Sequence, residues 1–236
     1  METRVAYLDV GEITLETQEL PDLGPTDVLV KTHQASVCGS ERYFYQGIHV
    51  PPEAKARGRP NEGSDYDRGE GDKHVYPMGT LGHEGGGTID EVGSAVETYL
   101  GGGEVSVGDR VGSLYYPTYT DYWVTDVSNV QPIPDGVSFE VGSLYEALAC
   151  AAWAALEMDV RLGDRVAVNG VGFAGNILLQ GAIEAGASEV YAVDPVEEKL
   201  AIAEDLGADV TINPREEDPV ARIDELTDDE GVEVTV

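Results

Sequence analysis

The feature that most constrains the fold is a predicted strand, a glycine-rich loop, a helix and a second strand in direct succession. They cover Arg165–Val168, Asn169–Gly175, Asn176–Ala185 and Glu189–Val193. Short apolar runs that alternate with helical segments are typical of parallel strands, because parallel strands need a crossover connection rather than a tight hairpin. The second half of the chain is therefore expected to form a parallel sheet covered by helices.

The loop has the spacing Gly-x-Gly-x-x-Gly, formed by Gly170, Gly172 and Gly175. The first glycine permits a tight turn, the second lets the backbone approach a pyrophosphate, and the third allows the helix to pack closely. Amide groups at the N-terminus of the following helix would then face the phosphates. The alternative is a glycine turn in a parallel sheet that binds no nucleotide.

Asp194 ends the second strand, about 20 residues after the loop, where the dinucleotide fingerprint has an acidic residue. Its carboxylate can accept hydrogen bonds from ribose hydroxyls and would repel a 2′-phosphate. NAD is therefore favoured over NADP. The predicted cofactor-binding residues are Gly170, Gly172, Phe173, Ala174, Gly175, Asp194 and Lys199.

The rest of the chain divides at about residue 150. Before it, strands are predicted at Arg4–Leu8, Ile13–Glu16, Asp27–Thr32 and Thr88–Val92 and in the aromatic stretch Tyr115–Val124. A Gly-Asp turn within Val105–Val111 is expected to join two strands, and a helix is predicted over Val137–Leu156. Beyond Asp194, helices are predicted over Glu197–Leu206 and Pro219–Leu226, and strands over Asp209–Ile212 and Gly231–Val236. We predict domains of residues 1–150 and 151–236.

Residues 48–79 interrupt the first domain. They are rich in Pro, Gly and charge and carry almost no apolar periodicity, so we expect a surface insertion. No stretch approaches the roughly 20 apolar residues of a membrane span, and Met1 is followed by polar residues rather than an export signal. A cytoplasmic protein without membrane contact is expected.

The charge balance is strongly acidic. There are 45 acidic against 14 basic residues, which gives a net charge of −31. Such a surface should repel nucleic acid and anionic membranes. Its self-repulsion would destabilise a compact state unless salt screens it, and at about 1 M salt the screening length falls to about 3 Å. We infer a halophilic source.

A second candidate site lies in the first half, at Gly82-His83-Glu84, which three consecutive glycines follow. The glycines would let backbone pass where side chains would not fit. Taken alone, this segment is equally consistent with a ligand-binding histidine and with a tight turn that carries a surface histidine. The two cysteines, Cys38 and Cys150, are too few for a disulfide framework or a four-cysteine structural zinc site.

Four motifs in order carry a family resemblance. They are Cys38-Gly39-Ser40, the Gly82-His83-Glu84 segment with Val92–Val96, the run Val107–Val111, and the nucleotide-binding half. Together they resemble the zinc-dependent medium-chain alcohol and polyol dehydrogenases over nearly the whole chain except residues 48–79. The resemblance implies an α/β protein. A β-rich, GroES-like catalytic domain would be followed by a partial Rossmann domain, a doubly wound parallel sheet.

The resemblance also implies a catalytic zinc. Cys38 matches the thiolate ligand, His83 the imidazole ligand, and Glu84 a carboxylate that is either a ligand or an outer partner. The last ligand is either Glu146 or Cys150, with a slight preference for Glu146. Zinc with an open position acts on a substrate oxygen as a Lewis acid, so that hydride can leave the adjacent carbon for the nicotinamide.

Other matches and departures refine the prediction. Ser40 matches the hydroxyl that relays the alcohol proton, and with Glu84 it completes the predicted catalytic residues. No cysteine follows the Gly-Asp-Arg-Val segment, so one catalytic zinc and no structural zinc is expected. Glu41 stands where Asp is common, and Tyr43 stands where a relay His is frequent. The last strands of the nucleotide sheet are missing, so a C-terminal truncation is expected.

The function expected is hydride transfer between NAD and an alcohol, polyol or sugar. A homo-oligomer is expected if a full-length chain exists. Two alternatives stay open. One is a truncated, catalytically silent remnant that still binds zinc or nucleotide. The other is a metal-free relative of the same fold, like the quinone reductases.

Overall fold

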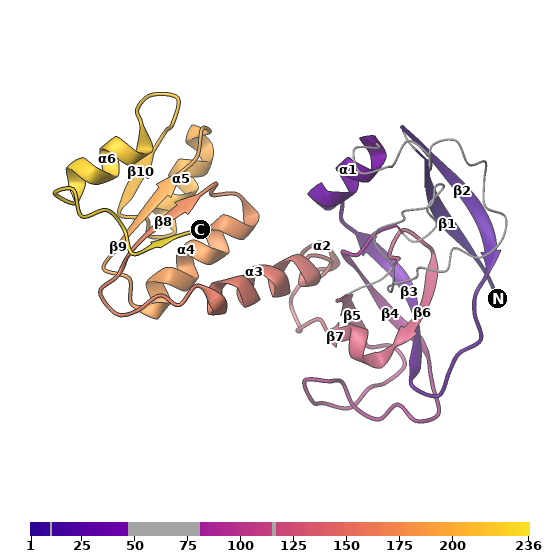
Figure 1. Cartoon of the computed structure of the whole chain (residues 1–236). Coiled ribbons are helices and arrows are strands. Elements are labelled where there is room, and N and C mark those ends of the chain that lie inside the picture. Colours follow the sequence, from indigo (N-terminus) through magenta and orange to yellow (C-terminus); the bar gives the residue numbers. More distant parts are fainter. Residues whose placement is uncertain (10, 47–80, 115–116) are drawn as a thin grey trace, which may run out of the picture. The chain divides into compact units, whose positions relative to one another are not determined.

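The computed structural model describes residues 1–9, 11–46, 81–114 and 117–236, which form two compact units, Met1–Glu146 and Ala147–Val236 (Figure 1). The predicted surface insertion at residues 48–79 lies outside the described residues, as do Tyr115 and Tyr116. The described parts confirm the predicted class, a β-rich unit followed by a unit of alternating strands and helices.

The first unit is built on an antiparallel sheet with the order β6-β3-β4-β5-β7. Its strands are β3 (Asp27–Ala35), β4 (Gly85–Val92), β5 (Arg110–Ser113), β6 (Tyr122–Asp126) and β7 (Val130–Pro132), with the 3-10 turn η1 (Val127–Asn129) before β7. One face of the sheet packs into a core that includes Val28, Val30, Ile89, Val111 and Trp123. Burial alternates along β6, whereas β3, β4 and β5 each have three consecutive buried residues.

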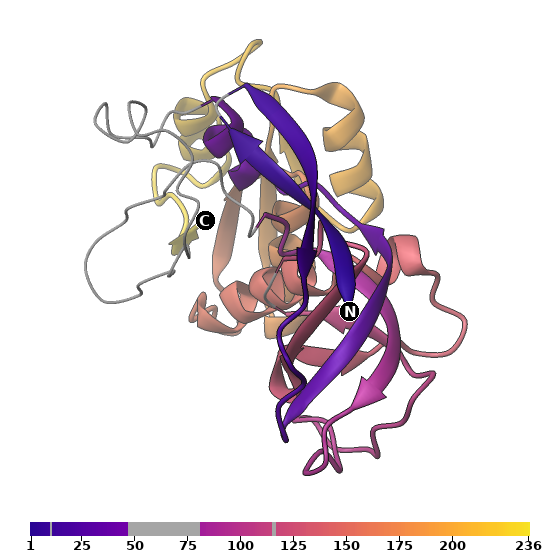
Figure 2. The same ribbon diagram turned by 90° about the vertical axis from the view of Figure 1, so that its right-hand side faces the viewer.

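A separate antiparallel hairpin precedes the sheet. It pairs β1 (Glu2–Asp9) with β2 (Glu12–Glu19) and forms the long twisted ribbon seen in Figures 1 and 2. Strand β1 is the buried partner, with Val5 and Leu8 inside, whereas Leu15 of β2 is exposed. Strand β3 extends three residues beyond the predicted Thr32, and helix α1 (Gly39–Gln46) follows it after a short loop that carries Cys38.

The three glycines after Glu84 are strand residues. The strand was predicted to begin at Thr88, but β4 begins at Gly85. Opposite the glycines, the register of β3 shifts between Thr32 and Gln34. A Cβ on Gly87 would lie 2.1 Å from the carbonyl oxygen of Lys31. The glycines therefore allow the approach of a neighbouring strand.

Three other predicted elements are corrected. The turn within Val105–Val111 forms, and Asp109 accepts hydrogen bonds there from the Ser106 amide and the Tyr99 hydroxyl. The strand expected after it is β5, whereas the residues before it make only an isolated bridge between Thr98 and Glu104. The predicted helix over residues 137–156 is split into α2 (Phe139–Gly142) and α3 (Tyr145–Glu157), and the Ser143 hydroxyl after α2 donates to the Glu140 carbonyl. The strand predicted over residues 115–124 begins at Tyr122.

The second unit contains a parallel sheet with the order β10-β9-β8-β11. Its elements are β8 (Arg165–Asn169), α4 (Phe173–Ala185), β9 (Glu189–Val193), α5 (Glu197–Asp205), β10 (Val210–Ile212), α6 (Pro219–Leu226) and β11 (Val234–Thr235). The order corresponds to strands 3-2-1-4 of a dinucleotide-binding fold. The chain reverses its direction of winding between β8 and β11, and such a switch point is where α/β sheets bind ligands.

Helices cover both faces of this sheet. Val166 and Val168 of β8 pack with Leu179 of α4 and Leu200 of α5 in one core, and Tyr191 of β9 lies in a second core against α6. Because successive strand residues point to opposite faces, the two cores lie on opposite sides of one sheet. This is the doubly wound arrangement that the sequence predicted. Among the described helices, none has the length and apolar character needed to cross a bilayer.

Candidate active site

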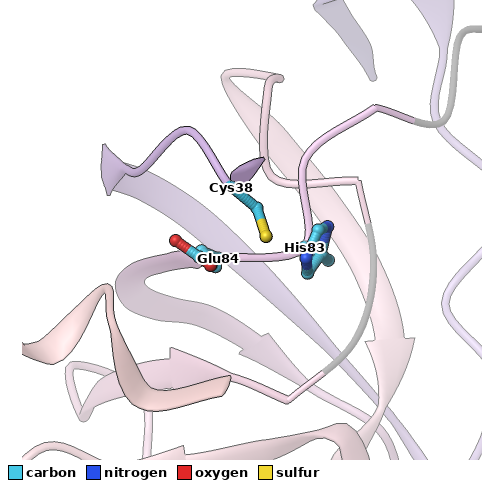
Figure 3. A group of neighbouring side chains, drawn as sticks. All are labelled: Cys38, His83 and Glu84. Atoms are coloured by element: carbon cyan, nitrogen blue, oxygen red, sulfur yellow. The ribbon is translucent and has the colours of Figure 1, made fainter. Parts of the chain in front are cut away.

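Three side chains with metal-ligating atoms come together in the first unit. Cys38 lies just before α1, and His83 and Glu84 lie just before β4. One ligand atom from each of the three lies within 4.8 Å of the other two. Figure 3 shows Cys38 pointing toward the segment that carries His83 and Glu84. Residues 45 positions apart in the sequence thus share one small site.

The segment that carries His83 is fixed by its neighbours. The Gly82 carbonyl accepts a hydrogen bond from the Thr118 amide, and the Glu84 carbonyl accepts bonds from the Thr118 hydroxyl and the Ser36 amide. Gly82 has φ +89°, and a Cβ there would lie 2.7 Å from Thr118 Oγ1. Only glycine fits this position at low cost. The Ser36 bond also ties this segment to the loop that carries Cys38.

Each ring nitrogen of His83 has a carboxylate oxygen within 4 Å. Its Nδ1 is 3.4 Å from Glu41 Oε1, and its Nε2 is 3.9 Å from Glu146 Oε2. The bond to Glu41 raises the pKa of His83 to about 9, against the lowering effect of burial, and Cys38 and Glu146 add to the increase. In the metal-free protein the imidazole is therefore protonated at neutral pH.

Glu41 and Tyr119 form an inner layer behind His83. Glu41 is 5% exposed, and its Oε2 accepts hydrogen bonds from the Cys38 amide and the Tyr119 hydroxyl. The Tyr119 hydroxyl also faces the Ser36 carbonyl at 2.8 Å. Glu41 was predicted only as a departure from the family pattern, and Tyr119 was not predicted as a site residue. The one signal for Tyr119 was its place in the aromatic stretch Tyr115–Val124.

The donor set suits zinc. A thiolate, an imidazole and a carboxylate are the three types of side chain that bind Zn²⁺ in proteins, and a site with three protein ligands keeps a position open for catalysis. A histidine ligand commonly donates its other ring N–H to a carboxylate, as His83 can do to Glu41. The observed cluster therefore fits a zinc ion held by Cys38, His83 and Glu84.

The remaining residues predicted for this site are Glu146, Ser40 and Cys150. Glu146, on the first turn of α3, approaches the cluster through His83. Ser40 lies on α1 and is exposed. Cys150 lies on the part of α3 that belongs to the second unit, where it is exposed.

The glycine loop has the form that the sequence predicted. It joins the carboxyl end of β8 to α4, and α4 begins at Phe173, three residues earlier than predicted. Gly172 is the N-cap residue, and no side chain caps the helix there. A Cβ on Gly175 would lie 2.0 Å from the Gly170 carbonyl oxygen, so the third glycine is required by close packing. The first turn of α4 thus presents backbone amides to a ligand.

Asp194 lies at the carboxyl end of β9, beside this loop. It is 3% exposed, and its carboxylate accepts hydrogen bonds from the Val196 amide at 3.0 Å and from Lys199 Nζ at 3.4 Å. A carboxylate can accept about four hydrogen bonds, so capacity for a ribose remains. Gly170 is also bonded here, through its amide to the Val193 carbonyl. Asp194, Lys199 and the loop therefore lie at one edge of the sheet.

Family models match both halves of the chain. The alcohol dehydrogenase GroES-like domain matches residues 24–160, and the zinc-binding dehydrogenase domain matches residues 174–236.

Individual relatives agree with these matches. The uncharacterized zinc-type alcohol dehydrogenase-like protein YdjJ of Escherichia coli is 30% identical over 99% of this chain and 69% of that protein. Sorbitol dehydrogenase of Rattus norvegicus is 30% identical over 89% of this chain and 59% of the enzyme. The crystal structure of 2R,3R-butanediol dehydrogenase from Bacillus subtilis superposes with a TM-score of 0.71 and 27% identity, over 99% of this chain and 69% of that one.

The chain thus spans between 59% and 69% of the length of these relatives. Its two matched domains follow each other in the expected order, and the first of them contains the cluster of Cys38, His83 and Glu84. The chain belongs to the family of zinc-type medium-chain alcohol dehydrogenases.

Proposed function

We propose that the chain acts in the transfer of hydride between an alcohol or polyol and NAD, with one zinc held by Cys38, His83 and Glu84. The observation that carries this proposal is the approach of their ligand atoms to within 4.8 Å of one another. A zinc ion there would supply Lewis acidity toward the substrate oxygen. The absence of cysteine from residues 112–122 supports a single zinc, without a structural one.

Glu146 is the preferred additional carboxylate of this site. Its Oε2 lies 3.9 Å from His83 Nε2, the nitrogen that faces away from Glu41. With Glu84 it gives the site a strongly negative character, which favours a divalent cation over a neutral ligand. Cys150 is the alternative, and replacing each residue in turn distinguishes them, because only the true ligand changes the zinc affinity.

The proposed substrate class is a small diol or polyol. Two relatives that match over most of this chain are named sorbitol dehydrogenase and (R,R)-butanediol dehydrogenase. Both names describe substrates with hydroxyls on neighbouring carbons. Ser40, exposed on α1, is the proposed relay for the proton that the alcohol loses.

NAD is the proposed cofactor, because Asp194 places a buried carboxylate beside the glycine loop. A 2′-phosphate there would meet negative charge. Lys199 lies 3.4 Å from the same carboxylate and would be a second hydrogen-bond donor for the ribose. The amides at the start of α4 would bind the pyrophosphate.

The decisive experiment measures zinc content, nucleotide affinity and turnover on the same preparation in molar KCl. We expect about one zinc per chain, tighter binding of NAD than of NADP, and NADH formation with sorbitol or 2,3-butanediol. Zinc and NAD binding without turnover on a broad alcohol panel would favour the catalytically silent alternative. If the protein binds nucleotide but retains no zinc even after zinc has been added, the metal-free reductase alternative would be favoured.

A further inference from the structure

We propose that Tyr119 is a positioning residue of the zinc site: its hydroxyl holds Glu41, and Glu41 holds the Nδ1 side of His83 so that Nε2 is left for the metal. The inference rests on the proposed function, since it takes the Cys38, His83 and Glu84 cluster as the zinc site. Tyr119 would not touch zinc or substrate. It would act only through the two segments that carry ligands.

The first step of the argument is the set of contacts made by the hydroxyl. The Tyr119 O–H faces the Glu41 carboxylate oxygen Oε2 and, at 2.8 Å, the carbonyl of Ser36. Glu41 Oε2 also accepts the amide of Cys38 at 3.2 Å, and its Oε1 faces His83. One hydroxyl therefore contacts the loop of Cys38 directly and the ring of His83 through a single carboxylate.

The second step is the way in which Tyr119 is itself held. Its amide donates to the Leu81 carbonyl at 3.3 Å, and its carbonyl accepts the Ala6 amide at 2.9 Å. A Cβ on Gly82 would lie 2.7 Å from the Cδ1 atom of the Tyr119 ring. The ring is thus packed against the backbone just before His83, and the missing side chain of Gly82 provides its space.

The third step is the conformational freedom of Glu41. A glutamate side chain has three rotatable bonds, and ordering such a long side chain costs on the order of 1–2 kcal/mol. The Cys38 amide and the Tyr119 hydroxyl both restrain the same oxygen, which leaves Oε1 directed at His83. Because the second partner of a histidine ligand fixes its tautomer and ring orientation, the restraint on Glu41 passes to the metal-binding nitrogen.

The hydroxyl is suited to this task at any physiological pH. Burial, and next its bond to Glu41, raise the pKa of Tyr119 far above its ordinary value. The group therefore remains a neutral donor. A phenylalanine would keep the ring packing against Gly82 and lose only the donor.

The test compares two tyrosine-to-phenylalanine variants of the full chain. Tyr119→Phe removes the hydroxyl at the site. Tyr99→Phe is the matched control, because Tyr99 is 4% exposed and donates to the Asp109 carboxylate at 2.7 Å in the same unit, outside the cluster. Zinc affinity is measured by competition with a chromophoric chelator, and the ligand field is read from the visible spectrum of the Co²⁺-substituted protein.

We expect Tyr119→Phe to weaken zinc binding about 10- to 100-fold, as loss of an outer partner commonly does, and to alter the cobalt spectrum. Tyr99→Phe should leave both within twofold of the wild type, although it also loses a buried hydrogen bond. Equal zinc affinity in Tyr119→Phe and wild type would overturn the inference. If the wild type itself binds no zinc, the proposed function fails instead.

A double-mutant cycle with Glu41→Gln tests the route. If Tyr119 acts through Glu41, adding Tyr119→Phe to Glu41→Gln should weaken zinc binding by less than threefold more. If the fold-loss of zinc affinity in the double variant equals the product of the two single losses, Tyr119 acts independently of Glu41. That result would also overturn the inference. The cycle is read in zinc affinity of the folded chain, so a loss of stability common to all variants does not affect it.

Discussion

Two glycine-rich segments of this chain look alike in sequence and are glycine-rich for different reasons. Around the metal cluster, a Cβ on Gly85 would lie 2.5 Å from the Thr118 side chain, and a Cβ on Gly87 would lie 2.1 Å from the Lys31 carbonyl. In the nucleotide loop, a Cβ on Gly170 or Gly172 would meet nothing within 4 Å among the described residues. The first segment is filled by the protein itself, whereas the first two glycines of the second face open space and only its third, Gly175, is closely packed.

The difference separates what folding requires from what a ligand requires. Gly87 must be glycine because a neighbouring strand occupies the space of its side chain. Gly170 must be glycine because its φ is +91°. Gly172 has neither reason in the described structure, since its backbone is extended and its surroundings are open. Under the proposed function, the remaining reason is the approach of a pyrophosphate to the backbone.

Loss of the metal thiolate should have the largest effect and should leave the nucleotide segment intact. Cys38→Ser removes one of three ligands, and we expect zinc to fall from about one per chain to less than about one tenth, because a hydroxyl does not replace a thiolate as a zinc ligand. NAD affinity should stay within twofold. Metal content by atomic emission and NAD titration by calorimetry check both. Full zinc occupancy in the variant would contradict the proposed ligand set.

The glycines themselves provide a matched pair. Gly87→Ala should reduce the free energy of unfolding by about 1–3 kcal/mol or more, because the new methyl group overlaps the backbone of β3. Gly172→Ala should change it by less than about 0.5 kcal/mol, as at ordinary surface sites, while weakening NAD binding. Urea titration and NAD titration are measured on both variants. Equal destabilisation by the two changes would remove the distinction between the segments.

The nucleotide half was the more predictable from sequence because its signals are local. The βαβ unit of β8, the glycine loop, α4 and β9, together with Asp194, is contained in about 30 residues. The structure confirms the predicted order of these elements. The start of α4 was placed three residues late because Phe173-Ala174-Gly175 was assigned to the glycine loop. Helix ends are set by cap geometry, which glycine spacing alone does not give.

The metal half depends on contacts distant in sequence. The resemblance selected Cys38 and His83, and the structure brings them together. Gly85 was not predicted as a strand residue, since glycine weakens strands and its pairing partner, Ala35 of β3, is 50 positions away. The importance of Tyr119 depends on an oxygen of Glu41, 78 positions away. The roles of Cys38 and His83 as ligands, and those of Glu84, Glu146, Cys150 and Ser40, stay predictions.

Zinc binding should depend on pH, whereas nucleotide binding should depend on it much less. The Glu41 carboxylate raises the pKa of His83 to about 9, while burial opposes it. The folded value lies above the ordinary 6.5, so the protonated ring stabilises the metal-free fold fully below pH 6.5, and this contribution is lost as the pH rises through 9. Zinc requires the neutral ring.

Apparent zinc affinity should therefore rise about tenfold per pH unit from 6.5 toward 9 on account of His83 and then level off. Chelator competition at four pH values measures this slope, and NAD affinity on the same samples is the control. A flat zinc profile would mean that His83 is not a ligand. An equal slope for both ligands would indicate a global change of the fold rather than the titration of one ring.

The smallest expected effect is on the nucleotide side, at Asp194. Asp194→Ala should weaken NAD binding about 10-fold, the loss expected for one or two hydrogen bonds to a charged acceptor, and should improve NADP relative to NAD, because Lys199 then meets the 2′-phosphate without an opposing carboxylate. The matched control is Asp209→Ala. Asp209 accepts the Val190 amide at 2.8 Å near the start of β9, as Asp194 accepts the Val196 amide beyond its end. Both variants lose a carboxylate bonded to backbone, yet only Asp194 lies beside the glycine loop, so Asp209→Ala should leave both nucleotide affinities unchanged. An unchanged ratio of NAD to NADP affinity in Asp194→Ala would remove this residue from cofactor selection and leave the open space at Gly172 as the main evidence for a nucleotide.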